Sequence, residues 1–113
     1  MRPDGFLTGR LLSDWQGAGP CACLIGTVQI AYCLFLLYRI TGEEHYRDAG
    51  YTANRFVRRL LRVSGPIELR GSVKGANPVD GAYGVYSYMN WACKFFVDLN
   101  ILERVMRHYD MCE

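Results

Sequence analysis

The longest apolar stretch of the chain, from Cys21 to Tyr38, contains no charged residue. It reads CACLIGTVQIAYCLFLLY, and Gly42 follows soon after it as a typical helix C-cap. Because this stretch is apolar on every side, it predicts either a buried helix or a membrane span. Its length lies at the lower limit for crossing a bilayer. The polar residues Thr27 and Gln29 in its middle raise the cost of insertion, so a buried helix is the favoured interpretation.

A 3.6-residue period predicts a second helix from Glu43 to Val63. Its acidic start and arginine-rich end suit the helix macrodipole. The predicted core face consists of Tyr46, Ala49, Ala53, Phe56, Val57, Leu60 and Leu61. The opposite face carries Arg47, Tyr51, Arg55, Arg58, Arg59 and Arg62. A basic stripe beside a tyrosine could hold phosphate or RNA, but the small net charge of the chain favours a solvated or interface face.

A third helix is predicted from about Tyr86 to His108. The positions that suit a core are Met89, Ala92, Cys93, Phe96, Leu99 and Val105, with Trp91, Phe95 and Leu102 on a flank. Asn90, Lys94 and Asp98 follow one another at intervals of four residues. This spacing places their side chains in one polar line along the helix, where Lys94 and Asp98 can pair.

The segments between these helices are rich in glycine and proline. Residues 1–20 are expected to be loop-rich, with a short helical turn near residues 10–15. The segment 64–84, SGPIELRGSVKGANPVDGAYG, contains too many helix breakers for a helix. Ordered loops of this length are often functional. The predicted fold is therefore all-α, with antiparallel helical hairpins and one long ordered loop in a single small helical domain over residues 1–113.

Charge and cysteine content exclude several classes of function. Thirteen basic and eleven acidic residues give a net charge of +2, so binding to nucleic acid or to a membrane surface is not expected. The five cysteines have no regular spacing, which predicts neither a disulfide framework nor a zinc site. We expect Cys33 and Cys93 in the core, and no metal or cofactor. The start, MRPDGFLTG, lacks a signal-peptide pattern, so a cytoplasmic location is expected.

Candidate catalytic residues are few, so enzymatic activity is left open. Neither a phosphate-binding glycine loop nor a Ser-His-Asp arrangement is indicated. Glycoside hydrolysis needs two carboxylates that face one bond. Glu68, Asp80 and Asp98 are the candidate acids, but each has an ordinary role in a turn, an ion pair or solvent. The catalytic residues are therefore unknown at this point.

Binding of a carbohydrate has more support, because sugars bind in largely apolar clefts that hold a few fixed polar groups. The rings available are those of Trp15, Tyr83, Tyr86, Tyr88 and Trp91. The polar groups available are those of Gln29, Asn90 and Lys94. The alternative is that these rings only pack the long loop onto the third helix.

A Pro-Asp-Gly turn precedes the third helix and should fold back over its start. Free N–H groups there favour the carboxylate of Asp80. Asn90 and Lys94 lie one turn apart on the same face. We therefore predict that Asp80, Tyr83, Asn90 and Lys94 meet at one end of the helices, with Trp15 or Trp91 as a wall.

Four segments together resemble a known family. They are CLIGTVQIA at 23–31, YRITG at 38–42, GSVKGANPVDGAY at 71–83 and NWACKFFVD at 90–98. Over residues 12–102 the chain resembles part of an α/α-toroid (six-hairpin) protein of the terpenoid-cyclase and glycosidase-like kind, often found with polysaccharide metabolism. The resemblance implies stacked helical hairpins and a cleft for a carbohydrate-type ligand. A full toroid has many more helices than three, and this loop reads KGANP where a Gly-Ser-x-Pro type of turn is expected.

An apolar first helix with only two others to cover it should leave apolar flanks open, and such patches usually mark an interface. We therefore expect a homo-oligomer, most simply a twofold dimer that buries part of the first or third helix. Two classes of function remain. One is a carbohydrate-binding or glycan-processing module, and the other is a structural, oligomerising interaction protein. Phosphate or nucleic-acid binding along the arginines of the second helix is a weaker third.

Overall fold

The structure is a computed structural model that describes residues 1–61, 64, 67, 70, 71, 73, 76, 77 and 90–112. Residues 76, 77, 90, 111 and 112 are described by their backbone alone. Its elements in chain order are β1 (Ala22–Cys23), α1 (Leu24–Thr41), α2 (Glu44–Arg58), β2 (Ala76–Asn77) and α3 (Asn90–Cys112). The prediction of a mainly helical, all-α protein is confirmed. The second helix ends before the predicted Val63, and the third continues past the predicted His108.

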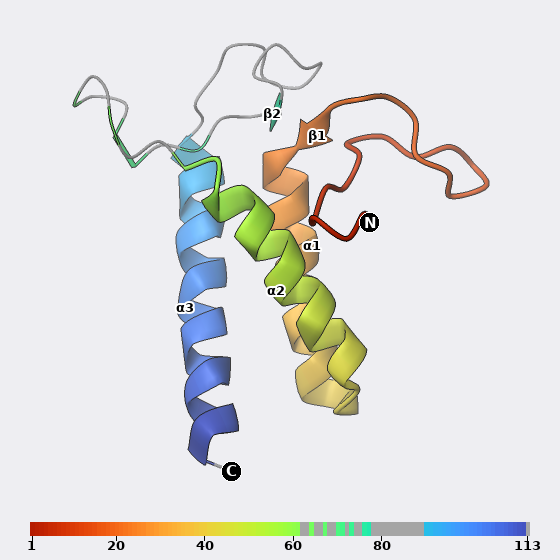
Figure 1. The fold of residues 1–113 in the computed structure, drawn as a ribbon. Helices are drawn as coiled ribbons and strands as arrows, with labels where there is room; N and C mark the ends of the chain where they lie inside the picture. Colours follow the sequence, from red (N-terminus) through yellow and green to blue (C-terminus); the bar gives the residue numbers. More distant parts are fainter. Residues whose placement is uncertain are drawn as a thin grey trace.

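The three helices lie side by side. Helix α1 packs against both of the others, and α2 meets α3 mainly through long side chains. Figure 1 shows α2 returning antiparallel along α1, while α3 runs in the same direction as α1. Side-chain contacts agree with these directions, since Tyr38 near the end of α1 meets Asp110 near the end of α3. Arg47 near the start of α2 also reaches Asp110. Grooves lie between α1 and α3 and between α2 and α3.

Both ends of α1 are capped. Cys23 is extended, and its Sγ accepts a hydrogen bond of 3.5 Å from the Gly26 N–H. At the other end Gly42 adopts the left-handed conformation, with φ of 73°, and donates its N–H to the Tyr38 carbonyl at 2.7 Å. The predicted C-cap is confirmed. A short strand pair that the sequence did not indicate joins β1 to β2, with Ala22 opposite Asn77.

The core lies where the three helices meet. Its buried apolar residues are Ala22, Leu24, Ile25, Val28, Ala31, Phe35, Ala53, Val57, Val73, Ala92, Phe96, Leu99, Leu102 and Met106. On α2 the predicted face is wrong in part, because Gly50 and Asn54 are buried while Ala49 and Phe56 are half-buried. The reason is that α2 has two neighbours. The buried side of α2 therefore faces both α1 and α3.

Three further expectations are corrected. Val105 is exposed on α3, whereas Leu102 and Met106 are buried, because α3 turns that face toward both other helices. Cys33 was expected in the core but is exposed on α1. Residues 10–18 form no helical turn. They form a hairpin in which the Ala18 N–H donates to the Arg10 carbonyl at 2.8 Å.

Candidate functional site

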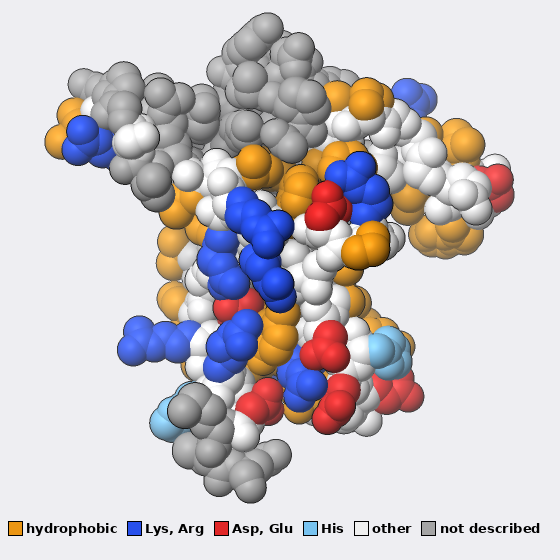
Figure 2. Space-filling view, viewed as in Figure 1, with side chains coloured by type: hydrophobic (Ala, Val, Ile, Leu, Met, Phe, Trp, Pro, Cys, Tyr) orange, Lys and Arg blue, Asp and Glu red, His pale blue; other side chains and the backbone are white. Residues whose placement is uncertain are grey.

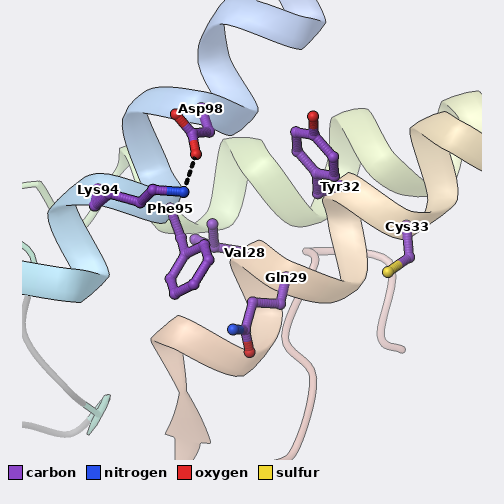
Figure 3. Close-up of a pocket in the computed structure, with 7 residues that line it drawn as sticks. All are labelled: Val28, Gln29, Tyr32, Cys33, Lys94, Phe95 and Asp98. Atoms are coloured by element: carbon purple, nitrogen blue, oxygen red, sulfur yellow. Dashed lines mark ion pairs between the residues drawn. The ribbon is translucent and has the colours of Figure 1, made fainter.

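A groove of about 490 Å³ lies between the first half of α1 and the start of α3. Its lining residues come from two helices that are far apart in the sequence (Figure 3). They are Val28, Gln29, Tyr32, Cys33, Lys94, Phe95 and Asp98. The volume falls within the range of small-molecule sites.

The α3 side of the groove carries an ion pair. Lys94 Nζ lies 2.6 Å from Asp98 Oδ2, as the spacing of four residues predicted. The ammonium also lies 4.8 Å from the centre of the Phe95 ring. Because both partners are substantially exposed, the pair contributes at most about 1 kcal/mol to stability. Both charges therefore remain accessible to a ligand at little cost.

The α1 side supplies an amide, a phenol ring and an apolar floor. Gln29, Tyr32 and Cys33 are spaced by three and four residues, so they project from the same side of α1. Val28 is buried beneath them. Figure 3 shows the Phe95 ring reaching from α3 toward Val28 and Gln29. The groove thus combines two aromatic walls with an exposed amide and an ion pair.

The structure brings some predicted site residues together and leaves others apart. Gln29, Lys94 and Asp98 line the same groove. Trp15 is 80% exposed at the tip of the 10–18 hairpin, where its φ of 68° is uncommon for a residue other than glycine. Trp91 is 49% exposed on α3 and does not line the groove.

The remaining part of the predicted site lies outside the described residues. Asp80 and Tyr83 belong to the segment 78–89, and for Asn90 the description covers only its backbone position at the start of α3. The predicted meeting of these three residues with Lys94 stays a prediction.

Sequence reasoning missed Tyr32, Cys33 and Phe95 as lining residues. The signal for the first two was present, because they follow Gln29 at helical spacing on the same side of α1. Phe95 directly follows Lys94 and was assigned to a flank. Tyrosine, cysteine and phenylalanine are also common residue types in protein cores. Only the packing of α1 against α3 therefore identifies these three as groove residues.

The contact between α2 and α3 is polar, and it uses part of the predicted basic face. Arg58 pairs with Glu103, which is almost fully buried, and Arg107 Nε lies 3.5 Å from the same carboxylate. The buried amide of Asn54 donates to Asn100 Oδ1 at 3.1 Å and to Glu103 Oε1 at 3.3 Å. This part of the predicted basic face therefore packs within the protein and is not simply solvated.

A second polar contact joins the first half of α2 to the end of α3. Burial raises the pKa of the Tyr51 phenol, and the Arg107 guanidinium, 3.9 Å from the centre of its ring, opposes that shift. Arg47 lies 3.7 Å from Asp110 and 5.3 Å from the centre of the Tyr38 ring. These pairs place α2 and α3 in one antiparallel register.

Two further observations bear on ligands and location. Within the described part of the chain, no group of three or more His, Cys, Asp or Glu side chains is placed to hold a metal ion.

The α1 helix is long and apolar enough to cross a membrane, and 33% of it is buried within the protein.

Comparisons of the chain with protein-family models, with curated proteins and with solved structures found no match.

Proposed function

We propose that the protein is a carbohydrate-binding helical module whose ligand lies in the groove between α1 and α3. The observation that carries this proposal is the convergence of Gln29 with Lys94 and Asp98 beside two aromatic rings. A sugar places its C–H face on a ring and its hydroxyl groups on amides and charges. Tyr32 and Phe95 supply the rings for such a ligand.

The proposed activity is binding rather than hydrolysis. Among the described residues that line this groove Asp98 is the one carboxylate, and it is paired with Lys94. Glycoside hydrolysis typically uses two carboxylates on opposite sides of the scissile bond. We further propose that the three helices correspond to a slice of an α/α toroid, as the sequence resemblance implies.

A binding panel of neutral and acidic oligosaccharides, measured by calorimetry or by NMR shifts, tests the proposal. Gln29→Ala and Lys94→Ala should each weaken binding at least about fivefold, because each removes one direct polar contact. Gln16→Ala is a matched control, since Gln16 is an exposed amide on the hairpin. Absence of binding by the unaltered protein across the panel would refute the proposal.

An oligomerising role is the second candidate, and the exposed side of α1 favours it. The large apolar side chains there are Ile30, Leu36, Leu37 and Ile40, and Ile40 is 81% exposed. Because the helix has no charged side chain from Leu24 to Tyr38, this face offers no ionic selectivity and matches an equally uncharged surface. The simplest such surface is the same face of a second copy, related by a twofold axis.

Sedimentation at micromolar concentration tests this second candidate. A dimer that Leu37→Glu converts to a monomer supports it, because the substitution places a charge in the apolar contact. Ser13→Glu, on the hairpin, is the control and should leave the dimer intact. A stable monomer of the unaltered chain rules this candidate out, and recovery only with detergent would instead indicate a membrane-spanning α1.

A further inference from the structure

A second groove lies on the other side of α3, between α2 and α3, and its volume is about 510 Å³. The described residues that line it are all different from those of the α1–α3 groove. Its lining residues are Arg58, Leu61, Phe96, Val97, Asn100, Ile101 and Arg104. The proposed carbohydrate site leaves this groove without a role.

The floor and walls of this second groove are apolar. Phe96 is almost fully buried, and Leu61 is half-buried. Val97 and Ile101 are 54% and 59% exposed, although both are large aliphatic residues. Water contact at such side chains is unfavourable, and an alkyl group that covers them removes this apolar surface from water.

The polar group between these side chains is the Asn100 amide, and it already has hydrogen-bond partners. Asn100 Nδ2 donates to the Phe96 carbonyl at 2.7 Å, one turn earlier on α3. Asn100 Oδ1 accepts hydrogen bonds from Asn54 and from Arg58. The amide therefore has little capacity left for a ligand, and the middle of the groove favours apolar groups.

Positive charge borders the apolar surface. Arg58 is held by Glu103, but Arg104 has no ion-pair or hydrogen-bond partner among the described residues and is exposed. Arg55 on α2 and Arg59 directly after it add two exposed guanidinium groups. Figure 2 shows Lys and Arg side chains gathered over α2 and toward α3 on this face. The apolar groove therefore lies in a positive local potential.

We propose that the groove between α2 and α3 binds a free, single-chain anionic amphiphile such as a fatty acid. Its alkyl chain lies on Phe96, Val97 and Ile101, and its carboxylate pairs with the guanidinium of Arg104. A charge-assisted, two-pronged contact of this kind suits arginine and a carboxylate. The ion pair between Arg58 and Glu103 holds the second guanidinium in place beside the groove.

The size of the groove is compatible with a small amphiphile. Its volume of about 510 Å³ lies within the usual range for small-molecule sites. A short alkyl chain matches this space.

Binding of decanoate below its micelle concentration, followed by NMR shifts of α2 and α3 amides, tests the proposal. Decanol and decyltrimethylammonium have the same alkyl chain without the negative charge, and acetate has the charge without the chain. We expect decanoate to bind at least about tenfold more tightly than each of these three. Equal binding of decanoate and decyltrimethylammonium would overturn the proposal, as would association only with anionic vesicles.

Variants locate the site. Arg104→Gln should weaken decanoate binding at least about fivefold, because it removes the ion pair. Arg55→Gln removes the same charge from an exposed position outside the groove lining and should change affinity less than about twofold. Ile101→Ser should weaken binding, while Val105→Ser on the same helix but outside the groove should not. Equal effects of Arg104→Gln and Arg55→Gln would overturn the assignment.

Discussion

Helix α2 makes two contacts of opposite character. Toward α1 it presents Gly50, against which the Phe35 ring of α1 lies directly, and Ala53 and Val57 are buried on the same stripe of the helix. Toward α3 it presents Asn54 and Arg58, which hold the buried carboxylate of Glu103. The same helix is therefore fixed by apolar packing on one side and by polar pairing on the other.

The two contacts differ in what they contribute to the fold. Apolar burial stabilises roughly in proportion to area and specifies no single partner atom. A buried ion pair adds little net stability over a well-packed apolar contact, but breaking it costs more, since a charge is left without its partner. One acceptor, Asn54 Oδ1, is buried and has no hydrogen-bond partner among the described residues. The polar contact is thus the less stabilising and the more selective of the two.

The largest effect is expected on the apolar side. Phe35→Ala should lower the free energy of unfolding by about 4 kcal/mol, because it leaves a cavity at a fully buried position. Urea unfolding measures the change. The neighbouring Leu36, which is 39% exposed, provides the control, and Leu36→Ala should cost about 1 kcal/mol or less. Similar losses at the two positions would contradict the packing described.

The polar side is tested by removing one partner. Glu103→Ala should cost about 2 kcal/mol, because Arg58 and Asn54 lose their acceptor within a buried contact. The control is Asp98→Ala, which breaks the exposed pair with Lys94 on the same helix and should cost about 0.5 kcal/mol.

The double variant Arg58→Met with Glu103→Leu sharpens that comparison. Replacing both charges by apolar groups should restore at least about 1 kcal/mol relative to Glu103→Ala. If the double variant is no more stable than the single one, the polar contact contributes stability and not only selectivity.

A smaller effect is expected at Gly50. A Cβ on this residue would come closer to the buried Phe35 ring than real Cβ atoms do. Overpacking therefore opposes the gain in helix propensity, and Gly50→Ala should cost about 1 kcal/mol. Gly26→Ala in α1 meets Cys23 Sγ at an ordinary 3.5 Å and should be stabilising. Thermal unfolding compares the two, and the opposite order would show that α1 and α2 are less closely packed.

The smallest effect is a pH dependence at Tyr51. Its pKa is raised on folding, chiefly by burial, so the folded state keeps the phenol proton more tightly than the unfolded state does. This contribution to stability is complete below the ordinary tyrosine pKa of about 10 and is lost as pH rises through the folded value. Urea midpoints between pH 9 and pH 11 should therefore fall more for the unaltered protein than for Tyr51→Phe. Parallel curves would refute burial of the phenol.

The sequence by itself determined the helices and some of their local features. An uncharged apolar run, a 3.6-residue period and Gly42 were enough to predict α1 and its C-cap, since these depend on neighbours within one or two turns. The pair between Lys94 and Asp98 was predictable for the same reason. Each of these features is decided by local backbone geometry.

Only the tertiary structure decided which side of each helix is used. The period of α2 indicated an apolar core face, but contact with two neighbours buried Gly50 and Asn54 and placed Arg58 against Glu103. Likewise Gln29 and Lys94 gave no sign in the sequence that they line one groove with Tyr32 and Phe95. Such pairings depend on the angle and register at which separate helices meet, and many side chains set these together.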